Sequence, residues 1–183
     1  MLFRSDKSNK NLVFLRAHVA FTLMLSLLSF GCATPLTGRN SGAGDTITIP
    51  VFGRIGAEDV LAHDELFVVL RDKYPVSPGH MLIVARRSVA LFHDLTQQER
   101  MRLLFWADWT QRHLTETLTP KPDAFNFGLN DGAAAGQTKP QFHFHIIPRY
   151  TGDVPDPRGG VRNVIPSKAR YWDTPKAPKD GHP

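Results

Sequence analysis

The stretch QFHFHIIPRY, residues 141–150, places two histidines two positions apart in a run of aromatic and branched apolar residues. Alternate side chains of a β-strand share one face. A strand here would project Gln141, His143 and His145 together and would turn the apolar residues between them into a core. Side chains two apart lie about 6.6 Å apart along a strand, so both imidazoles can surround one small group, such as a phosphate, without bonding to each other.

Three interpretations of the two histidines compete. They can be surface residues on the wet face of a sheet. They can bind a metal, because His-x-His on a strand is a common pair of zinc ligands, with His80 and Asp72 as further candidate ligands. They can also do covalent phosphorus chemistry, in which a neutral imidazole nitrogen attacks a phosphate ester. Cys32 is the single cysteine, which excludes a disulfide within the chain and offers no cysteine cluster to a metal.

The loop before this strand favours the phosphate interpretation. Residues 132–138, GAAAGQT, offer consecutive backbone N–H groups with little side-chain bulk, a composition typical of a nest that holds phosphate oxygens. Gln137 and Thr138 add an amide donor and a hydroxyl donor beside it. An ordinary hairpin loop would explain the glycines alone, but the loop leads directly into the histidine strand.

The rest of the central chain alternates strand and turn signals, with one long helix. The TQQE sequence predicts a capping box between Thr96 and Glu99, and the helix should run to about Leu118, ahead of a proline. One of its two apolar stripes should pack on the sheet, and the second needs another partner. That second stripe is Met101, Phe105 and Trp109. The other predicted strands begin at Thr46 or occupy residues 65–72, 80–87 and 123–130.

The two ends of the chain differ from its centre. Residues 1–32 begin basic, become apolar and end in SFGC, so they predict a signal or lipoprotein-type leader with lipidation at Cys32. We therefore expect an extracytoplasmic or membrane-anchored protein, or a cytoplasmic one if this segment is not a leader. Residues 33–45 indicate a flexible linker and 167–183 an extended or disordered tail.

The charge does not indicate nucleic-acid binding. The formal net charge is +5, but four basic residues and one acid fall within the first 31 residues, which leaves +2 for the remainder. A modest basic bias suits an anionic small molecule equally well. We therefore expect no specific nucleic-acid partner.

Several motifs, in this order and spacing, resemble the histidine triad (HIT) family, in the branch of fragile histidine triad and diadenosine polyphosphate hydrolases. The resemblance covers roughly residues 50–166 and implies an α+β fold within a domain at 46–166. The implied fold has a five-stranded antiparallel sheet, one long helix and a short one. The family's homodimer, built partly on the long helix, would cover the second stripe. The motifs are DKYPVSPGHMLIVARR, LFHDLTQQE, FNFGLNDGAAAGQT, HFHIIPR and GDVPDPRGGVRNVIP.

The resemblance also implies roles for individual residues. His143 corresponds to the central histidine, the nucleophile that forms a nucleotidyl-imidazole on the α-phosphate. His145 corresponds to the third histidine, which contacts the phosphate and supports departure of the leaving group. Asn126 would lie behind the site. The implied substrate-binding residues are Asp72 at the ribose, Asn130 and His80 near the α-phosphate, and Gln137 and Thr138 at the phosphate oxygens.

Gln141 departs from the family pattern, because it occupies the place of the first histidine. A glutamine amide both donates and accepts hydrogen bonds, so it can orient its neighbours, but it cannot titrate. We therefore count Gln141 among the catalytic residues in an orienting role and expect activity to be retained.

These residues predict a nucleotide hydrolase or nucleotidyl transferase. It would cleave at the α-phosphate of dinucleoside polyphosphates or related nucleoside phosphate conjugates, with no metal on the protein and magnesium carried only by a polyphosphate substrate. Two alternatives stay open: a nucleotide-binding module with little turnover, and a metal-binding protein that uses His143 and His145.

Overall fold

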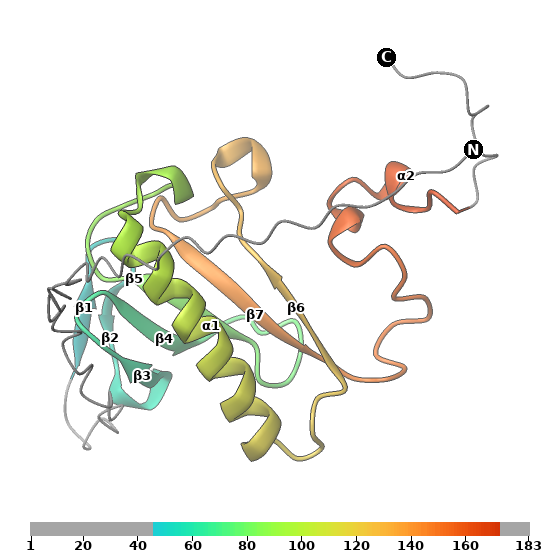
Figure 1. The fold of residues 1–183 in the computed structure, drawn as a ribbon, viewed down its shortest axis with the longest axis horizontal. Helices are drawn as coiled ribbons and strands as arrows, with labels where there is room; N and C mark the ends of the chain where they lie inside the picture. Colours follow the sequence, from blue (N-terminus) through green and yellow to red (C-terminus); the bar gives the residue numbers. More distant parts are fainter. Residues whose placement is uncertain (1–45, 173–183) are drawn as a thin grey trace, which may run out of the picture. The chain divides into compact units, whose positions relative to one another are not determined.

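The structure is a computed structural model that describes residues 46–172. One five-stranded antiparallel sheet forms its centre, in the order β3-β4-β5-β7-β6. The strands β1 and β2 form a separate two-stranded hairpin that is not hydrogen-bonded to this sheet. Figure 1 shows the long helix α1 running across the sheet. The strands are β1 (Ile47–Ile49), β2 (Gly53–Ile55), β3 (Val60–His63), β4 (Phe67–Arg71), β5 (Met81–Ala85), β6 (Ala124–Gly128) and β7 (His143–Arg149). The helices are α1 (Gln97–Thr117), α2 (Pro166–Ala169) and the short 3₁₀ turns η1 (Ala57–Asp59), η2 (Phe92–Asp94), η3 (Ala133–Ala135) and η4 (Gly160–Val164).

The five-stranded antiparallel sheet and the long helix are confirmed, but one strand differs from the prediction. The segment that begins at Thr46 pairs with β2 in the separate hairpin and does not join the main sheet. The fifth strand is β3, which pairs with β4. The sequence hides β3 because it has only four residues, too few for a clear alternating pattern.

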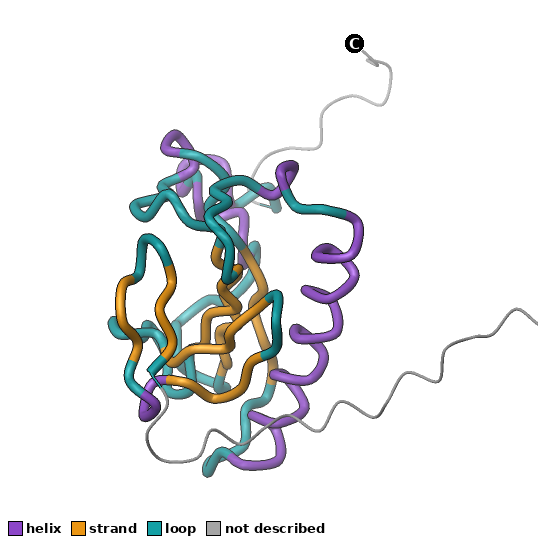
Figure 2. Tube along the Cα trace, turned by 90° about the vertical axis from the view of Figure 1, so that its left-hand side faces the viewer, coloured by secondary structure: helices purple, strands orange, loops and turns teal. Residues whose placement is uncertain are grey.

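The two faces of the sheet are buried by different elements. On one face, α1 packs through Leu103, Trp106 and Leu114 onto the core that contains Phe67, Ile83 and Ile146. On the other face, the β1–β2 hairpin covers a second apolar cluster that includes Leu70 and Val84. Figure 2 shows α1 along one side of the strands. The histidine-bearing face is therefore the one that α1 leaves free.

The start of α1 is fixed by the predicted capping box. Glu99 N–H donates to Thr96 Oγ1 at 3.2 Å, and Thr96 N–H donates to Glu99 Oε2 at 2.7 Å. Arg87 donates to both oxygens of Glu99, at 2.6 and 2.8 Å. The hydrogen bond from Arg87, the largest cause, lowers the pKa of Glu99 to about 2 despite the opposing effect of burial.

Asp64 joins α1 to the β3–β4 turn. Its Oδ1 accepts from the backbone N–H groups of Leu66 and Phe67, both at 2.8 Å. Its Oδ2 accepts from Arg102 Nε and from Trp106 Nε1, the latter at 2.8 Å. Burial raises the pKa of Asp64, but these hydrogen bonds outweigh it and leave the pKa lowered. One carboxylate thus holds the helix in position over the sheet.

The second stripe of α1 is only partly covered. Trp109 packs within the chain, edge-on against Trp106 and stacked on His113. Met101 is 65% exposed and Phe105 38% exposed. Leu104, next to them, is 64% exposed. An apolar patch of Met101, Leu104 and Phe105 therefore remains on the outer surface of the helix.

The chain after β7 forms η4 and α2. Residues 167–183 were expected to be an extended or disordered tail, and of these the structure describes only residues 167–172. Gly159 has φ +86°, and the ring of Trp172 lies 3.3 Å from the position that a Cβ at Gly159 would occupy. Arg158 lies over the Trp172 ring at 4.6 Å. The aromatic and cationic contacts of Trp172 give this Pro/Gly-rich segment a fixed path.

No helix within residues 46–172 is both long and apolar enough to cross a membrane. The leader, Cys32 and the linker lie outside the described residues.

Replacing Thr96 with alanine should lower the free energy of unfolding by about 1 kcal/mol, the usual cost of losing an N-cap hydroxyl. Urea denaturation of both proteins measures this difference. Gln98→Ala is the matched control, because Gln98 is exposed in the same helical turn and takes no part in the capping box. Equal losses in the two variants would contradict the role of the cap.

Candidate active site

Strand register brings the two histidines of β7 to the face opposite α1. His143 pairs with Val84 of β5, and His145 pairs with Leu82. Val84 and Leu82 belong to the cluster under the hairpin. Residues opposite each other in antiparallel strands project to the same side, so the imidazoles lie on the hairpin side of the sheet.

His80 and Asp72 meet His145 on this face. His80 Nε2 lies 3.0 Å from His145 Nδ1. Asp72 Oδ2 lies 3.4 Å from His80 Nε2 and 3.9 Å from His145 Nδ1. Asp72 and His80 frame the β4–β5 turn, where Asp72 N–H donates to the His80 carbonyl at 3.0 Å. The structure therefore brings His145 together with two residues of the β4–β5 turn, of which His80, the nearer in the sequence, is 65 positions away.

Hydrogen bonds fix the tautomers of His80 and His145. Val76 N–H donates to His80 Nδ1 at 3.3 Å, so the proton of a neutral His80 is on Nε2. Since His80 Nε2 then donates to His145 Nδ1, the proton of a neutral His145 is also on Nε2. That atom is buried and has no hydrogen-bond partner within residues 46–172. His145 therefore presents an unused N–H donor.

His143 has the opposite tautomer. Its Nδ1 lies 2.7 Å from the backbone carbonyl oxygen of Gln141. A carbonyl oxygen can only accept, so Nδ1 carries the proton and Nε2 keeps its lone pair. The His143 and His145 rings meet edge-on with centroids 5.2 Å apart, without a hydrogen bond between them. The neighbouring rings thus offer one nucleophilic nitrogen and one N–H donor.

Burial keeps His145 neutral. Desolvation, followed by the proximity of His143 and His80, lowers the pKa of His145 to about 4, against a smaller opposing effect of Asp72. Desolvation likewise lowers the pKa of His80, and Asp72 partly offsets it. Both rings are therefore uncharged at neutral pH, as the chain of hydrogen bonds requires.

A metal would find three possible ligand atoms here. Atoms of Asp72, His80 and His145 lie within 4.8 Å of one another, and His143 is not part of the group. An imidazole binds a metal through a nitrogen lone pair. At His80 the Val76 N–H occupies the lone pair of Nδ1, so Nε2 carries a proton toward the other two residues. The donors present fit a hydrogen-bonded chain better than a metal centre.

The loop before β7 is closed by the side chain of Gln137. Gly132 N–H donates to Gln137 Oε1 at 3.0 Å, and Gln137 Nε2 donates to the Ala90 carbonyl at 2.9 Å. Gly132 and Gly136 have φ of +96° and +89°, which allow the tight η3 turn between them. The Gln137 amide is thus engaged in holding the loop, and the backbone N–H groups of Gly132, Ala135, Gly136 and Gln137 already donate within it. The phosphate-binding candidates are therefore the backbone N–H groups of Ala133, Ala134 and Thr138.

Thr138 and Asn130 lie on either side of this loop. Thr138 is exposed, and Asn130 is half-buried two residues after Gly128, the partner of His145 in β6. The side-chain Cγ of Asn130 lies 4.0 Å from the place of a Cβ on Gly136. The Asn130 side chain therefore lies beside the loop.

Gln141 is buried and lies just before β7 begins. Its Nε2 donates to the carbonyl oxygens of Ala85 and Arg87, at 2.6 and 2.7 Å. The side chain therefore anchors the start of β7 to the end of β5, and its backbone carbonyl holds His143. The orienting role expected for Gln141 therefore has one contact that supports it, between the main-chain carbonyl of Gln141 and His143. The side chain of Gln141 does not make this contact.

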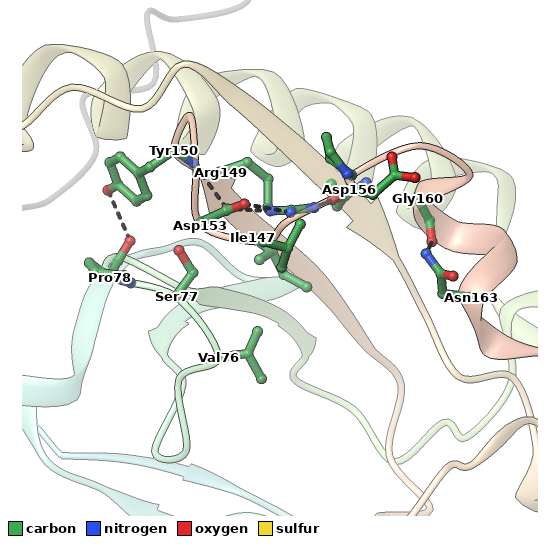
Figure 3. Close-up of a pocket in the computed structure, with 13 residues that line it drawn as sticks. Val76, Ser77, Pro78, Ile147, Arg149, Tyr150, Asp153, Asp156, Gly160 and Asn163 are labelled. Carbon is green, nitrogen blue, oxygen red and sulfur yellow. Dashed lines mark hydrogen bonds and ion pairs between the residues drawn. The ribbon is translucent and has the colours of Figure 1, made fainter. Parts of the chain in front are cut away.

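A cavity of about 380 Å³ continues the histidine face beyond His145. Ile147 and Arg149, the next residues of β7 on that face, form its floor with Asn126, which pairs with Ile147. Figure 3 shows its two walls, the turn before His80 and the segment after β7. The lining residues are Val76, Ser77, Pro78, Asn126, Ile147, Arg149, Tyr150, Asp153, Val154, Asp156, Pro157, Gly160 and Asn163.

Sequence analysis missed two parts of the site. Phe52, in the β1–β2 turn, lies edge-on to His143 with centroids 5.8 Å apart. Its signal is a large aromatic residue in the turn of an alternating segment. Val76 contributes its backbone N–H to His80, a contact that leaves no signal in the residue type.

Comparisons with known proteins show the family to which the chain belongs. The model of the HIT domain family matches residues 56–152, more than half of the chain. The chain is 34% identical over 96 residues to the AP-4-A phosphorylase of Mycobacterium tuberculosis, covering 52% of this chain and 48% of that protein. It is 32% identical over 117 residues to a bis(5'-adenosyl)-triphosphatase of Saccharomyces cerevisiae, covering 63% and 53%.

A solved structure shows the same fold. The NitFhit protein of C. elegans superposes with a TM-score of 0.56 at 28% identity, over 70% of this chain and 30% of that one. The chain spans about half the length of the curated relatives it matches. This fold and this histidine strand define a histidine triad domain. The chain belongs to the HIT domain family.

The tautomers can be read directly by ¹⁵N NMR of the imidazole rings at pH 7. We expect His143 protonated on Nδ1, and His80 and His145 protonated on Nε2. On acidification His145 should stay neutral until about pH 4, because burial lowers its pKa to that value. Single His→Asn variants assign the signals. An Nε2-protonated His143, or a His145 that titrates near pH 6.5, would contradict this arrangement.

Proposed function

We propose that this protein is a nucleotide hydrolase or nucleotidyl transferase that cleaves at the α-phosphate of dinucleoside polyphosphates or related conjugates. The observation that carries the proposal is the pair of opposite tautomers, with a lone pair at His143 Nε2 beside an unpartnered N–H at His145 Nε2. The names of the two curated relatives, a phosphorylase and a triphosphatase of diadenosine polyphosphates, support this substrate class.

The first step is attack by His143 Nε2 on the α-phosphorus. A nitrogen–phosphorus bond forms, and the bond from phosphorus to the bridging oxygen breaks. The ring becomes cationic and keeps its proton on Nδ1, where the Gln141 carbonyl lies 2.7 Å away. Hydrogen bonds to ionised groups are stronger than neutral ones, so this carbonyl stabilises the intermediate more than the free imidazole.

His145 would stabilise the oxygens of the reacting phosphate. Its neutral ring would donate through Nε2–H, and the backbone N–H groups of Ala133, Ala134 and Thr138, which are not engaged within the loop, would donate as well. A phosphate leaving group departs as an anion, so a hydrogen bond suffices and no acid has to lose its proton. Asp72 would contact the ribose, with His80 holding His145 in position.

The second step releases the nucleotide. Water adds to phosphorus, the nitrogen–phosphorus bond breaks, and one proton passes to solvent while His143 returns to its neutral form. Gln141 needs no titratable group in either step, because its contribution is a carbonyl and an anchor. A magnesium ion would enter only with a polyphosphate substrate.

The two alternatives are less well supported. A metal-binding protein using His143 and His145 would need both lone pairs directed at one ion, but His143 lies outside the cluster of possible ligands. A binding module without turnover would not need a tautomer that frees the nucleophilic nitrogen. Measuring AMP release from diadenosine triphosphate separates binding from turnover.

His143→Ala should reduce AMP release by at least about 10³-fold, because it removes the nucleophile. An alkaline quench of the wild-type reaction should give a nucleotide adduct on His143 by mass spectrometry. His93→Ala is the control, since the His93 side chain is 72% exposed, is paired with Asp94 and is not part of the cluster of Asp72, His80 and His145. An adduct on another residue, or undiminished turnover in His143→Ala, would refute the mechanism.

We also propose that the protein is a homodimer through the patch of Met101, Leu104 and Phe105 on α1. Leu104→Glu should place a charge in the interface and shift sedimentation from dimer to monomer. Val164→Glu places the same charge on an exposed apolar residue outside α1 and should leave the dimer intact. A wild-type monomer at micromolar concentration would refute the proposal.

A further inference from the structure

The cavity beyond His145 is a continuation of the reactive face and not a separate depression. Its floor residues Ile147 and Arg149 follow His143 and His145 at the same alternate spacing. At about 3.3 Å per residue, they lie about 7 and 13 Å along the strand from His145. A substrate group that extends past one phosphate and one sugar would arrive there.

The walls of the cavity are tied to the catalytic strand. Arg149 donates to both oxygens of Asp153, at 2.6 and 2.8 Å, and also to Asn126 Oδ1, at 2.5 Å. Tyr150 Oη donates to the Pro78 carbonyl at 3.1 Å. Figure 3 shows the bond from Tyr150 to Pro78, which joins the two walls, and the bonds between Arg149 and Asp153. The cavity thus has a built shape that does not depend on an occupant.

The charges of the cavity are already neutralised. Among the described residues that line it, Arg149 is the one cation, and it is paired with Asp153. The other lining carboxylate, Asp156, is paired with Arg158 at 2.9 Å. A phosphate would find no unpaired positive charge and would face two carboxylates. The cavity suits an uncharged group.

The remaining surface suits a flat group with polar edges. Apolar contact comes from Ile147, Val76 and Pro157, and side-chain amides from Asn126 and Asn163. Ser77 Oγ lines the cavity, is buried, and has no hydrogen-bond partner within residues 46–172. A volume of about 380 Å³ lies in the usual range for small-molecule sites. A nucleobase with its sugar has these properties.

The position of Asp72 indicates which of the two nucleosides of a dinucleoside polyphosphate the cavity would bind. In the sheet order, β7 separates β4 and β5 from β6. Asp72 follows β4, so a ribose bound there lies on the β4 side of the histidines. The cavity floor lies on β7 and β6. The second nucleoside, beyond the bridging phosphates, has the β6 side open to it.

We propose that this cavity binds the nucleoside of the leaving group, and that it makes the enzyme prefer dinucleoside polyphosphates over nucleotides with small leaving groups. The inference rests on the proposed function. The segment 153–163, which follows the catalytic strand, would then be a specificity element, with Asn163 at its edge.

Asn163→Trp tests this by filling the cavity from η4. We expect the ratio of kcat/KM for diadenosine triphosphate to that for adenosine 5'-phosphofluoridate to fall at least tenfold. Val164→Trp is the matched control, because Val164 is the next residue of the same 3₁₀ turn, is 81% exposed and does not line the cavity. An unchanged ratio in Asn163→Trp, or an equal fall in both variants, would overturn the proposal.

A binding measurement separates this proposal from the proposed function. By calorimetry, Asn163→Trp should weaken diadenosine triphosphate at least tenfold relative to AMP, whether or not the protein turns the substrate over. A wild-type protein that cleaves neither substrate would refute the function alone. A variant with equal losses for diadenosine triphosphate and AMP, or with no loss, would refute the leaving-group site alone.

Discussion

The hydrogen bond from His143 Nδ1 to the Gln141 carbonyl is the contact on which the proposed chemistry of this site depends. It leaves the lone pair of the ring on Nε2. In the proposed mechanism it would remain in place as positive charge develops on the ring. The carbonyl is itself held because the Gln141 side chain is fastened to Ala85 and Arg87 at the end of β5. The main-chain oxygen and the buried side-chain amide of Gln141 therefore orient His143 together, and this orientation needs no titratable side chain.

The order of the strands explains how one face serves several purposes. With β7 in the interior of the sheet, its histidines have β5 and the hairpin cluster on one side and β6 on the other. The helix α1 fills the opposite face, anchored through Asp64. The elements on the histidine face remove water from His145, and this desolvation lowers its pKa. Neighbouring groups then decide which ring nitrogen carries its proton.

Much of this arrangement could be predicted from local patterns. Alternation identified the strand that carries His143, the TQQE sequence identified the start of α1, and the glycines flanking η3 identified a turn. The pairing of His80 with His145 depends on the register between β5 and β7, which no local pattern specifies. The order of residues 159–172 depends on Trp172 reaching back to Gly159, a tertiary contact that overrides a composition rich in proline and glycine. The anchoring of Gln141 to main-chain carbonyls was equally invisible, because those acceptors carry no residue identity.

Val76 shows how far a site can rest on an atom that every residue but proline shares. Val76 is 74% exposed, and its backbone N–H determines where the proton of His80 lies. Any other amino acid except proline would supply the same N–H group and leave this proton placement unchanged. A scan that truncates side chains one by one would therefore not reveal this role of the position. Only a change to the peptide group itself, such as an ester linkage or an imino acid, would expose it.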